Sequence, residues 1–142
     1  MITQQDLIDR FGADELAELT DPEHHKVINV ATVKLAIADA VGVAGGYLNA
    51  VGLVRRDSAG NFVYIDSVLP ADLVLNICNI ARYNLHKDGA TETIKDRYDD
   101  AKAWLKDVKK DPTMLTGEKP VTGNTNSSIA VMPNPVPSIY GD

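Results

Sequence analysis

Histidine and cysteine, which serve as zinc ligands and as catalytic groups, are scarce in this sequence, with three histidines and one cysteine. His24 and His25 are adjacent, acids stand beside them at Asp21 and Glu23, and His86 lies far along the chain. Neighbouring helical residues diverge by about 100°, whereas a metal ion needs ligands that converge on one point. We therefore expect no metal site and interpret the paired histidines as solvated loop residues.

The patterns of nucleophilic catalysis are also missing from the sequence. Cys78 is the single cysteine, which excludes an internal disulfide, and its apolar neighbours are typical of a small buried hydrophobe. There is no nucleophile elbow, no zinc-binding HExxH pattern and no glycine loop of the kind that cradles phosphate. We therefore expect that the protein is not an enzyme and has no cofactor.

Two stretches that each carry an Arg-Tyr pair, residues 70–87 and 91–110, have the pattern of amphipathic helices. In the second stretch, apolar residues recur at steps of four, three, four and three, which places them on one side of a helix. These residues are Ile94, Tyr98, Ala101, Leu105 and Val108. Pro70 suits a helix start and Gly89 a helix end, so we expect an antiparallel helical hairpin.

The Arg-Tyr pairs, Arg82-Tyr83 and Arg97-Tyr98, favour a packing role over a functional one. A tyrosine ring packs well at a core edge, and an arginine stem covers that edge while its head stays in water or finds an acid. For Arg82 we predict a structural ion pair with Asp39 inside the helical body.

Trp104 lies at the flank of the apolar stripe of residues 94–108. Core packing would explain it, and so would a role as an interface anchor, because aromatic residues dominate interface hot spots. We keep both interpretations and count Trp104 among the candidate interface residues.

The first half of the chain predicts two short helices and one long one. Thr3 suits an N-cap for a helix that ends at Gly12, residues 14–19 form a second short helix, and residues from about 29 or 32 to 51 form a long amphipathic helix. Gly42, Gly45 and Gly46 lie within the long helix. They imply a break near Gly45 or the close approach of another helix, and we favour close packing because the apolar period continues across them.

Residues 53–66 change character and predict a small β-hairpin. A turn-forming cluster at residues 57–61 separates β-prone segments, the second of which contains Phe62 and Tyr64. Two strands alone are marginally stable in water, so the hairpin must lean on the helices or pair with another chain. Phe62 and Tyr64 are therefore further candidate interface residues.

The last 32 residues, from Asp111, contain five of the seven prolines and no helical period. Such a segment gains too little from burial to order itself alone, and fully extended it reaches on the order of 100 Å. We expect an extended C-terminal arm that binds other protein molecules, with one run able to add as a strand and prolines that favour an extended course. Its candidate interface residues are Ile129, Val131, Met132, Pro133, Pro135, Pro137, Ile139 and Tyr140.

Together these segments predict an all-α fold: a small bundle of three main helices and two short N-terminal helices, with a β-hairpin insertion. We divide the chain into a helical domain, residues 1–110, and the arm, residues 111–142.

The distribution of charge bears on possible partners. Residues 1–23 contain seven acids and one arginine and account for −6, which equals the net charge of the whole chain. No stripe of Lys and Arg is present to displace counterions from phosphate, so we do not expect specific DNA binding. An acidic surface is compatible with a duplex that passes nearby, because repulsion keeps it from sticking. We also find no apolar run that approaches the roughly 18 residues of a membrane span, and we expect no membrane partner.

Several blocks of the sequence resemble the small virion proteins of Mu-like phages and prophages, which are regarded as head-tail adaptor or head-completion proteins. The blocks lie discontinuously in residues 2–110, and the sequence departs from the pattern in its longer segment at residues 53–69 and in its long tail. They are Asp6-Leu7-Ile8, Phe11-Gly12, Glu15-Leu16, Leu19-Thr20-Asp21, Ala36-Ile37-Ala38-Asp39-Ala40, Tyr47-Leu48, Ala81-Arg82-Tyr83-Asn84-Leu85, Ala90-Thr91-Glu92 and Asp96-Arg97-Tyr98-Asp99-Asp100-Ala101.

The resemblance implies a structural protein of the virion neck, made in the host cytoplasm and located at the head-tail junction. It implies a homo-oligomeric ring, dodecameric in such connectors, that contacts the portal protein on one side and a tail, tail-terminator or stopper protein on the other. An alternative from another class is a small cytoplasmic interaction or regulatory module whose arm orders on a partner. An accessory subunit of an enzyme is a weaker alternative.

Overall fold

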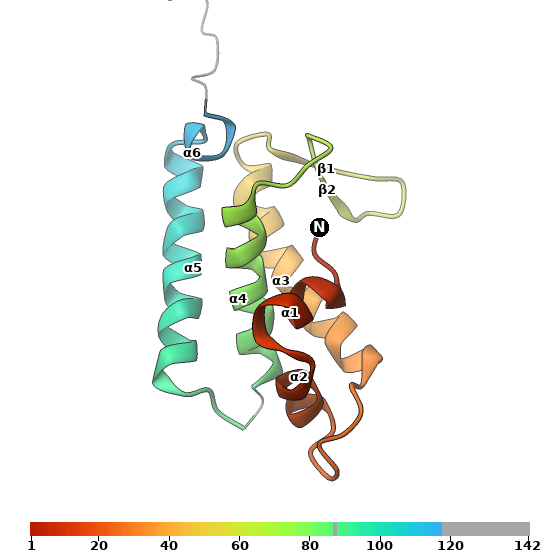
Figure 1. Ribbon diagram of the computed structural model, residues 1–142. Helices are drawn as coiled ribbons and strands as arrows, with labels where there is room; N and C mark the ends of the chain where they lie inside the picture. Colours follow the sequence, from red (N-terminus) through yellow and green to blue (C-terminus); the bar gives the residue numbers. More distant parts are fainter. Residues whose placement is uncertain (87, 118–142) are drawn as a thin grey trace, which may run out of the picture.

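The computed structural model describes residues 1–86 and 88–117, which form a helical bundle with a small hairpin at one end (Figure 1). The elements are α1 (Gln4–Phe11), α2 (Ala13–Thr20), α3 (Val30–Asn49), β1 (Val54–Arg56), β2 (Phe62–Tyr64), α4 (Ala71–Leu85), α5 (Glu92–Lys110) and α6 (Thr113–Thr116). The three long helices lie side by side, α1 and α2 cover one side of them, and the hairpin and α6 lie at the same end. The predicted all-α fold with a hairpin insertion is confirmed.

Side-chain caps set the starts of three helices. At α1, Thr3 accepts a hydrogen bond from the backbone N–H of Asp6, and the Asp6 carboxylate accepts one from the N–H of Thr3, which completes a capping box. Asn29 caps α3 and Thr91 caps α5 in the same way, each by accepting from an N–H three residues on. These polar residues fix where the apolar stripes begin.

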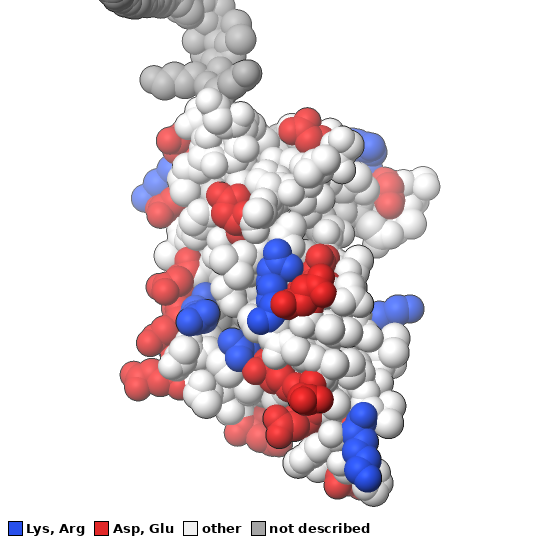
Figure 2. Space-filling view, in the orientation of Figure 1, with Lys and Arg blue, Asp and Glu red and all other residues white. Residues whose placement is uncertain are grey.

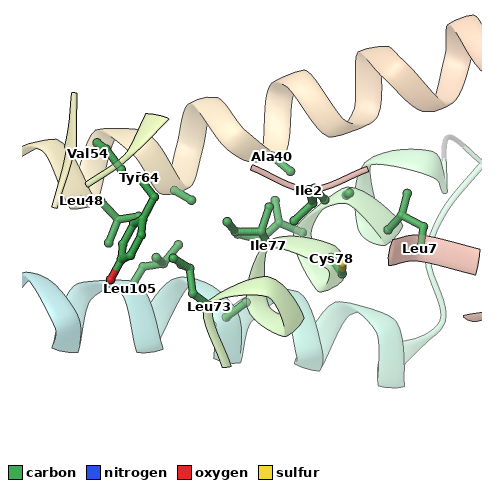
Figure 3. Close-up of a cluster of buried hydrophobic side chains, with 14 of the residues drawn as sticks. Ile2, Leu7, Ala40, Leu48, Val54, Tyr64, Leu73, Ile77, Cys78 and Leu105 are labelled. Atoms are coloured by element: carbon green, nitrogen blue, oxygen red, sulfur yellow. The ribbon is translucent and has the colours of Figure 1, made fainter. Parts of the chain in front are cut away.

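The core is built where α4 packs between α3 and α5. Leu48, Ile77 and Leu105 come from these three helices and are fully buried. Burying a side chain of this size stabilises a fold by about 1.5–3 kcal/mol. Figure 3 shows Tyr64 reaching from the hairpin between α3 and α5, beside Leu48 and Leu105. The hairpin is therefore anchored in the helical core.

Helix α3 is continuous through its glycines, and the close approach at Gly45 comes from the hairpin rather than from another helix. A Cβ atom built on Gly45 would lie 2.1 Å from the Phe62 ring, whereas one built on Gly42 or Gly46 would meet nothing within 4 Å. Gly45 makes room for an aromatic ring, which corrects the prediction that a second helix lies there.

The hairpin has a regular antiparallel register, in which Val54 pairs with Tyr64 and Arg56 with Phe62. In its loop the Asp57 carboxylate accepts hydrogen bonds from two backbone N–H groups, those of Ala59 and Asn61. These bonds lower the pKa of Asp57 below the usual value for an aspartate. The Asp57 carboxylate therefore stabilises the conformation of the loop.

Beyond α5 the structure differs from the extended arm that we predicted from Asp111. Residues 113–116 form α6, and Leu115 packs against the core. A helix of four residues is too short to leave a periodic signal in sequence. The rest of the predicted arm, residues 118–142, lies outside the described residues.

Helix α3 is long and apolar, although we expected no segment with the length and hydropathy of a membrane span. In length and composition Val30–Asn49 would suffice to cross a membrane, although core helices of soluble proteins meet the same criterion. Lys34 and Asp39 interrupt its apolar run, which is why the sequence pattern did not reveal it. Only 28% of its most apolar 18-residue stretch is buried, so much of this apolar helix lies on the surface.

Candidate interaction surface

Arg82 makes the strongest polar contact between the N-terminal helices and the bundle. Its guanidinium donates to both carboxylate oxygens of Glu15, each at 2.7 Å, and lies 4.4 Å from the centre of the Phe11 ring. The predicted partner was Asp39, which is wrong: Asp39 is exposed on the outer side of α3. Glu15 and Arg82 are 67 residues apart, and only the packing of the N-terminal helices against α3 and α4 brings them together.

The two Arg-Tyr pairs bring their tyrosines together. The rings of Tyr83 and Tyr98 stack with centroids 4.0 Å apart and planes 13° apart, which joins α4 to α5. Arg97 is exposed, whereas Arg82 is half-buried. The packing interpretation therefore holds for both tyrosines and for Arg82.

The candidate metal and nucleophile residues take structural positions. The Asp21 carboxylate accepts backbone hydrogen bonds from His24, Lys26 and Val27, which lowers its pKa and organises the turn after α2. Cys78 is fully buried, and burial raises the pKa of its thiol to about 11. Within residues 1–86 and 88–117, no group of three or more His, Cys, Asp or Glu is placed to hold a metal ion.

His86 lies near the Arg82–Glu15 pair at the end of α4, and its Nε2 atom is buried without a hydrogen-bond partner. Burial lowers the pKa of His86, while the neighbouring Glu15 carboxylate raises it and the Arg82 guanidinium lowers it. The net shift is downward, so His86 is neutral at neutral pH.

The exposed side of α3 carries apolar side chains, and we call it the outer face of α3. Leu35 is 62% exposed and Val43 is 37% exposed, with Lys34 and Asp39 as the charges beside them. The outer face consists of Ala31, Lys34, Leu35, Ala38, Asp39, Gly42, Val43 and Gly46. Contiguous exposed apolar surface of this kind marks sites of protein–protein contact.

A groove of about 870 Å³ runs beside the outer face, between the N-terminal segment, α3 and the hairpin. Gly42 and Gly46 line it with open space where side chains would stand, and Ile37, Val41 and Phe62 add apolar surface. A second hollow also borders Met1, Phe62 and Val63, so β2 lines both. A volume of this size exceeds that of any single side chain, so the groove has room for several residues of polypeptide.

The candidate interface aromatics differ in exposure. Tyr64 is buried in the core, and Phe62 is half-buried with the Arg56 guanidinium 3.9 Å from its ring centre. Trp104 is half-buried and packs against the core, which favours the packing interpretation for it. Of the three, Phe62 borders the groove. The remaining candidates lie outside the described residues: Ile129, Val131, Met132, Pro133, Pro135, Pro137, Ile139 and Tyr140.

The sequence did not identify Glu15, Leu35, Gly42 or Gly46 as parts of a surface site. A signal was present for the last three, since residues 35, 38, 42, 43 and 46 are all uncharged and lie away from the buried stripe of the helix. Glu15 had no distinguishing sequence signal, because it is one of seven acidic residues near the N-terminus.

Acidic side chains gather on the face that carries α1 and α2. Figure 2 shows them over the lower part of that face, with further acidic side chains along the side where α5 lies and with Lys and Arg above and below them. The chain therefore has two contrasting surfaces: an acidic one over the N-terminal helices and an apolar one on α3.

The sequence was compared with known proteins. The family model described as "Bacteriophage Mu, Gp36" matches residues 2–132, which is most of the chain. No curated protein is similar enough to count as a match.

Proposed function

Because this chain belongs to the bacteriophage Mu Gp36 family, we propose that it is a structural protein of the virion that forms a ring at the head-tail junction. Membership makes it a protein of Mu-like phages, and the outer face of α3 is the observation that carries the structural role. In this proposal the ring lies between the portal protein and the tail or its terminator or stopper protein.

A closed ring needs two different surfaces on each subunit, because head-to-tail contacts are heterologous. The outer face of α3 supplies one apolar surface with few charges, which is the composition of an interface centre. Its small residues, Ala38, Gly42 and Gly46, would let another backbone approach closely.

The acidic N-terminal face supports a place near DNA without binding to it. Seven acids and one arginine within residues 1–23 repel a duplex, which favours passage over adhesion. In the proposed ring this face would be turned toward the path of the DNA.

The test is assembly with the portal protein. Light scattering after size-exclusion chromatography should show a ring when the full chain is mixed with portal protein, and Leu35→Lys should reduce ring formation at least tenfold. Lys106→Leu on α5 is a matched control, since it changes an exposed helical residue outside the outer face of α3. If the chain stayed monomeric and did not bind the portal protein, the connector role would be contradicted.

The alternative is a small interaction or regulatory module whose C-terminal segment orders on a host protein. It predicts a monomer that binds no portal and is absent from purified virions. Detection of the chain by mass spectrometry in the neck of disassembled particles would favour the connector.

A further inference from the structure

One edge of the hairpin is protected against pairing and the other is not. Strand β1 carries Arg55 and Arg56, whereas β2 and the residue after it read Phe62-Val63-Tyr64-Ile65, with neither a charge nor a proline. Sheets use charged side chains and prolines to keep their edges from pairing with other chains. The edge of β2 has no such protection.

The backbone of β2 has groups available for another strand. Ile65 donates to Leu53 and Asp57 donates to Asn61, so in the alternating ladder the N–H and C=O groups of Phe62 and Tyr64 point away from β1. No hydrogen bond to these outward groups is formed by residues 1–86 or 88–117. A third strand would satisfy them.

The groove beside β2 has room for that strand. Gly42 and Gly46 have no side chains, so the space above this part of α3 is open and a strand can approach the helix backbone. Val41 and Phe62 line the same groove and offer apolar contact. Every second residue of an added strand would face this floor.

The chain itself contains a matching segment outside the described residues. From Pro120 to Gly141 it has no charged residue, and Ile129-Ala130-Val131-Met132 is an apolar run that ends where Pro133 removes a backbone donor. The family match ends at Met132 and so includes this run. Eleven residues separate Gly117 from Ile129, which span up to about 36 Å when extended. Since α6 and the hairpin lie at the same end of the bundle (Figure 1), a link of this length would allow the run to reach the hairpin of an adjacent copy.

We propose that residues 129–132 of one copy add as a third strand to the free edge of β2 in a second copy, with the following prolines in the groove. The inference rests on the proposed function, because the ring supplies the second copy. Each subunit would then hold its neighbour through backbone hydrogen bonds as well as through the outer face of α3.

Cross-linking between differently labelled copies tests this pairing. Full-length Val63→Cys and full-length Val131→Cys are mixed under ring-forming conditions and oxidised with diamide. The native Cys78 stays out of the reaction because it is buried and its thiol pKa is about 11. The expected product is a covalent dimer of one chain of each kind, with at least tenfold higher yield than from Val27→Cys mixed with Val131→Cys.

Val27 is a suitable control position. It is 68% exposed and precedes α3 at the end of the bundle opposite the hairpin. Equal yields from both mixtures would overturn the proposal. A double variant, Val63→Cys with Val131→Cys, that cross-links only within single chains would overturn it as well.

A second pair of variants separates this inference from the proposed function. Val63→Lys should weaken self-association at least tenfold, Val27→Lys should not, and circular dichroism should show the same helical melt for both. Normal rings on the portal with Val63→Lys would refute the strand addition and leave the connector role intact. Cross-linked rings that bind no portal would refute the connector role and leave the strand addition intact.

Discussion

Helices α3 and α5 are nearly equal in length, with 20 and 19 residues, and both bury one side against α4. Their other sides differ. Helix α5 contains eleven charged residues, among them the exposed pair Lys95–Asp99, whereas α3 contains two. The apolar period locates the core in both helices, but the composition of the opposite side separates a helix that faces water from one that has surface left to cover.

The largest expected effect tests whether the inner sides are equivalent. Leu48→Ala on α3 and Leu105→Ala on α5 each remove a fully buried side chain, so each should lower the free energy of unfolding by about 2–5 kcal/mol. Urea unfolding followed by circular dichroism measures this. A loss below 1 kcal/mol at either position would break the equivalence.

The next comparison lies within α3, between a glycine that faces the hairpin and one on the outer face. Gly45→Ala would place a Cβ 2.1 Å from the Phe62 ring and should destabilise by about 1–3 kcal/mol. Gly42→Ala meets open space and should stabilise by up to about 1 kcal/mol through helix propensity. Opposite signs in thermal melts sharpen the contrast between the two sides of the helix.

Ion pairs provide the third comparison. The Arg82 and Glu15 side chains are only 19% and 26% exposed, so Glu15→Gln should cost about 1–3 kcal/mol. Asp99→Asn breaks the exposed pair on α5 and should cost less than about 0.5 kcal/mol. Asp39→Asn is the control for the wrong prediction: in a double-mutant cycle with Arg82→Ala, its effect on the free energy of unfolding should be the same with and without Arg82, whereas a difference would contradict Glu15 as the sole partner.

The smallest expected effect is a dependence of stability on pH, which comes from His86 at the C-terminal end of α4. The unfolded His86 titrates near 6.5, its pKa in the fold is lower, and the unfolded chain therefore binds the proton first as the pH falls through about 6.5. The free energy of unfolding should decline below that pH. Above it, His86 is neutral in both states and should add no pH dependence to stability. Urea midpoints between pH 7.5 and 5.5 measure the slope, which His86→Gln should reduce.

Local signals predicted the helices because each depends on neighbours in sequence. The steps of the apolar residues predicted α5, Thr3 and Pro70 marked helix starts, and the polar cluster at residues 57–61 marked the hairpin. Contacts between distant segments did not follow, since the partner of Arg82 depends on how α2 docks and the space at Gly45 depends on where the hairpin folds back. The interaction surface needed the structure for the same reason: only the packed bundle shows which side of α3 is left uncovered.

The position of Trp104 has a practical consequence. It is the single tryptophan of the chain, lies in α5 half-buried against the core, and has no counterpart in residues 118–142. Its intrinsic fluorescence therefore reports the state of the helical body without a label. One emission spectrum can thus tell a variant that has lost its fold from a variant that has lost only its neighbours.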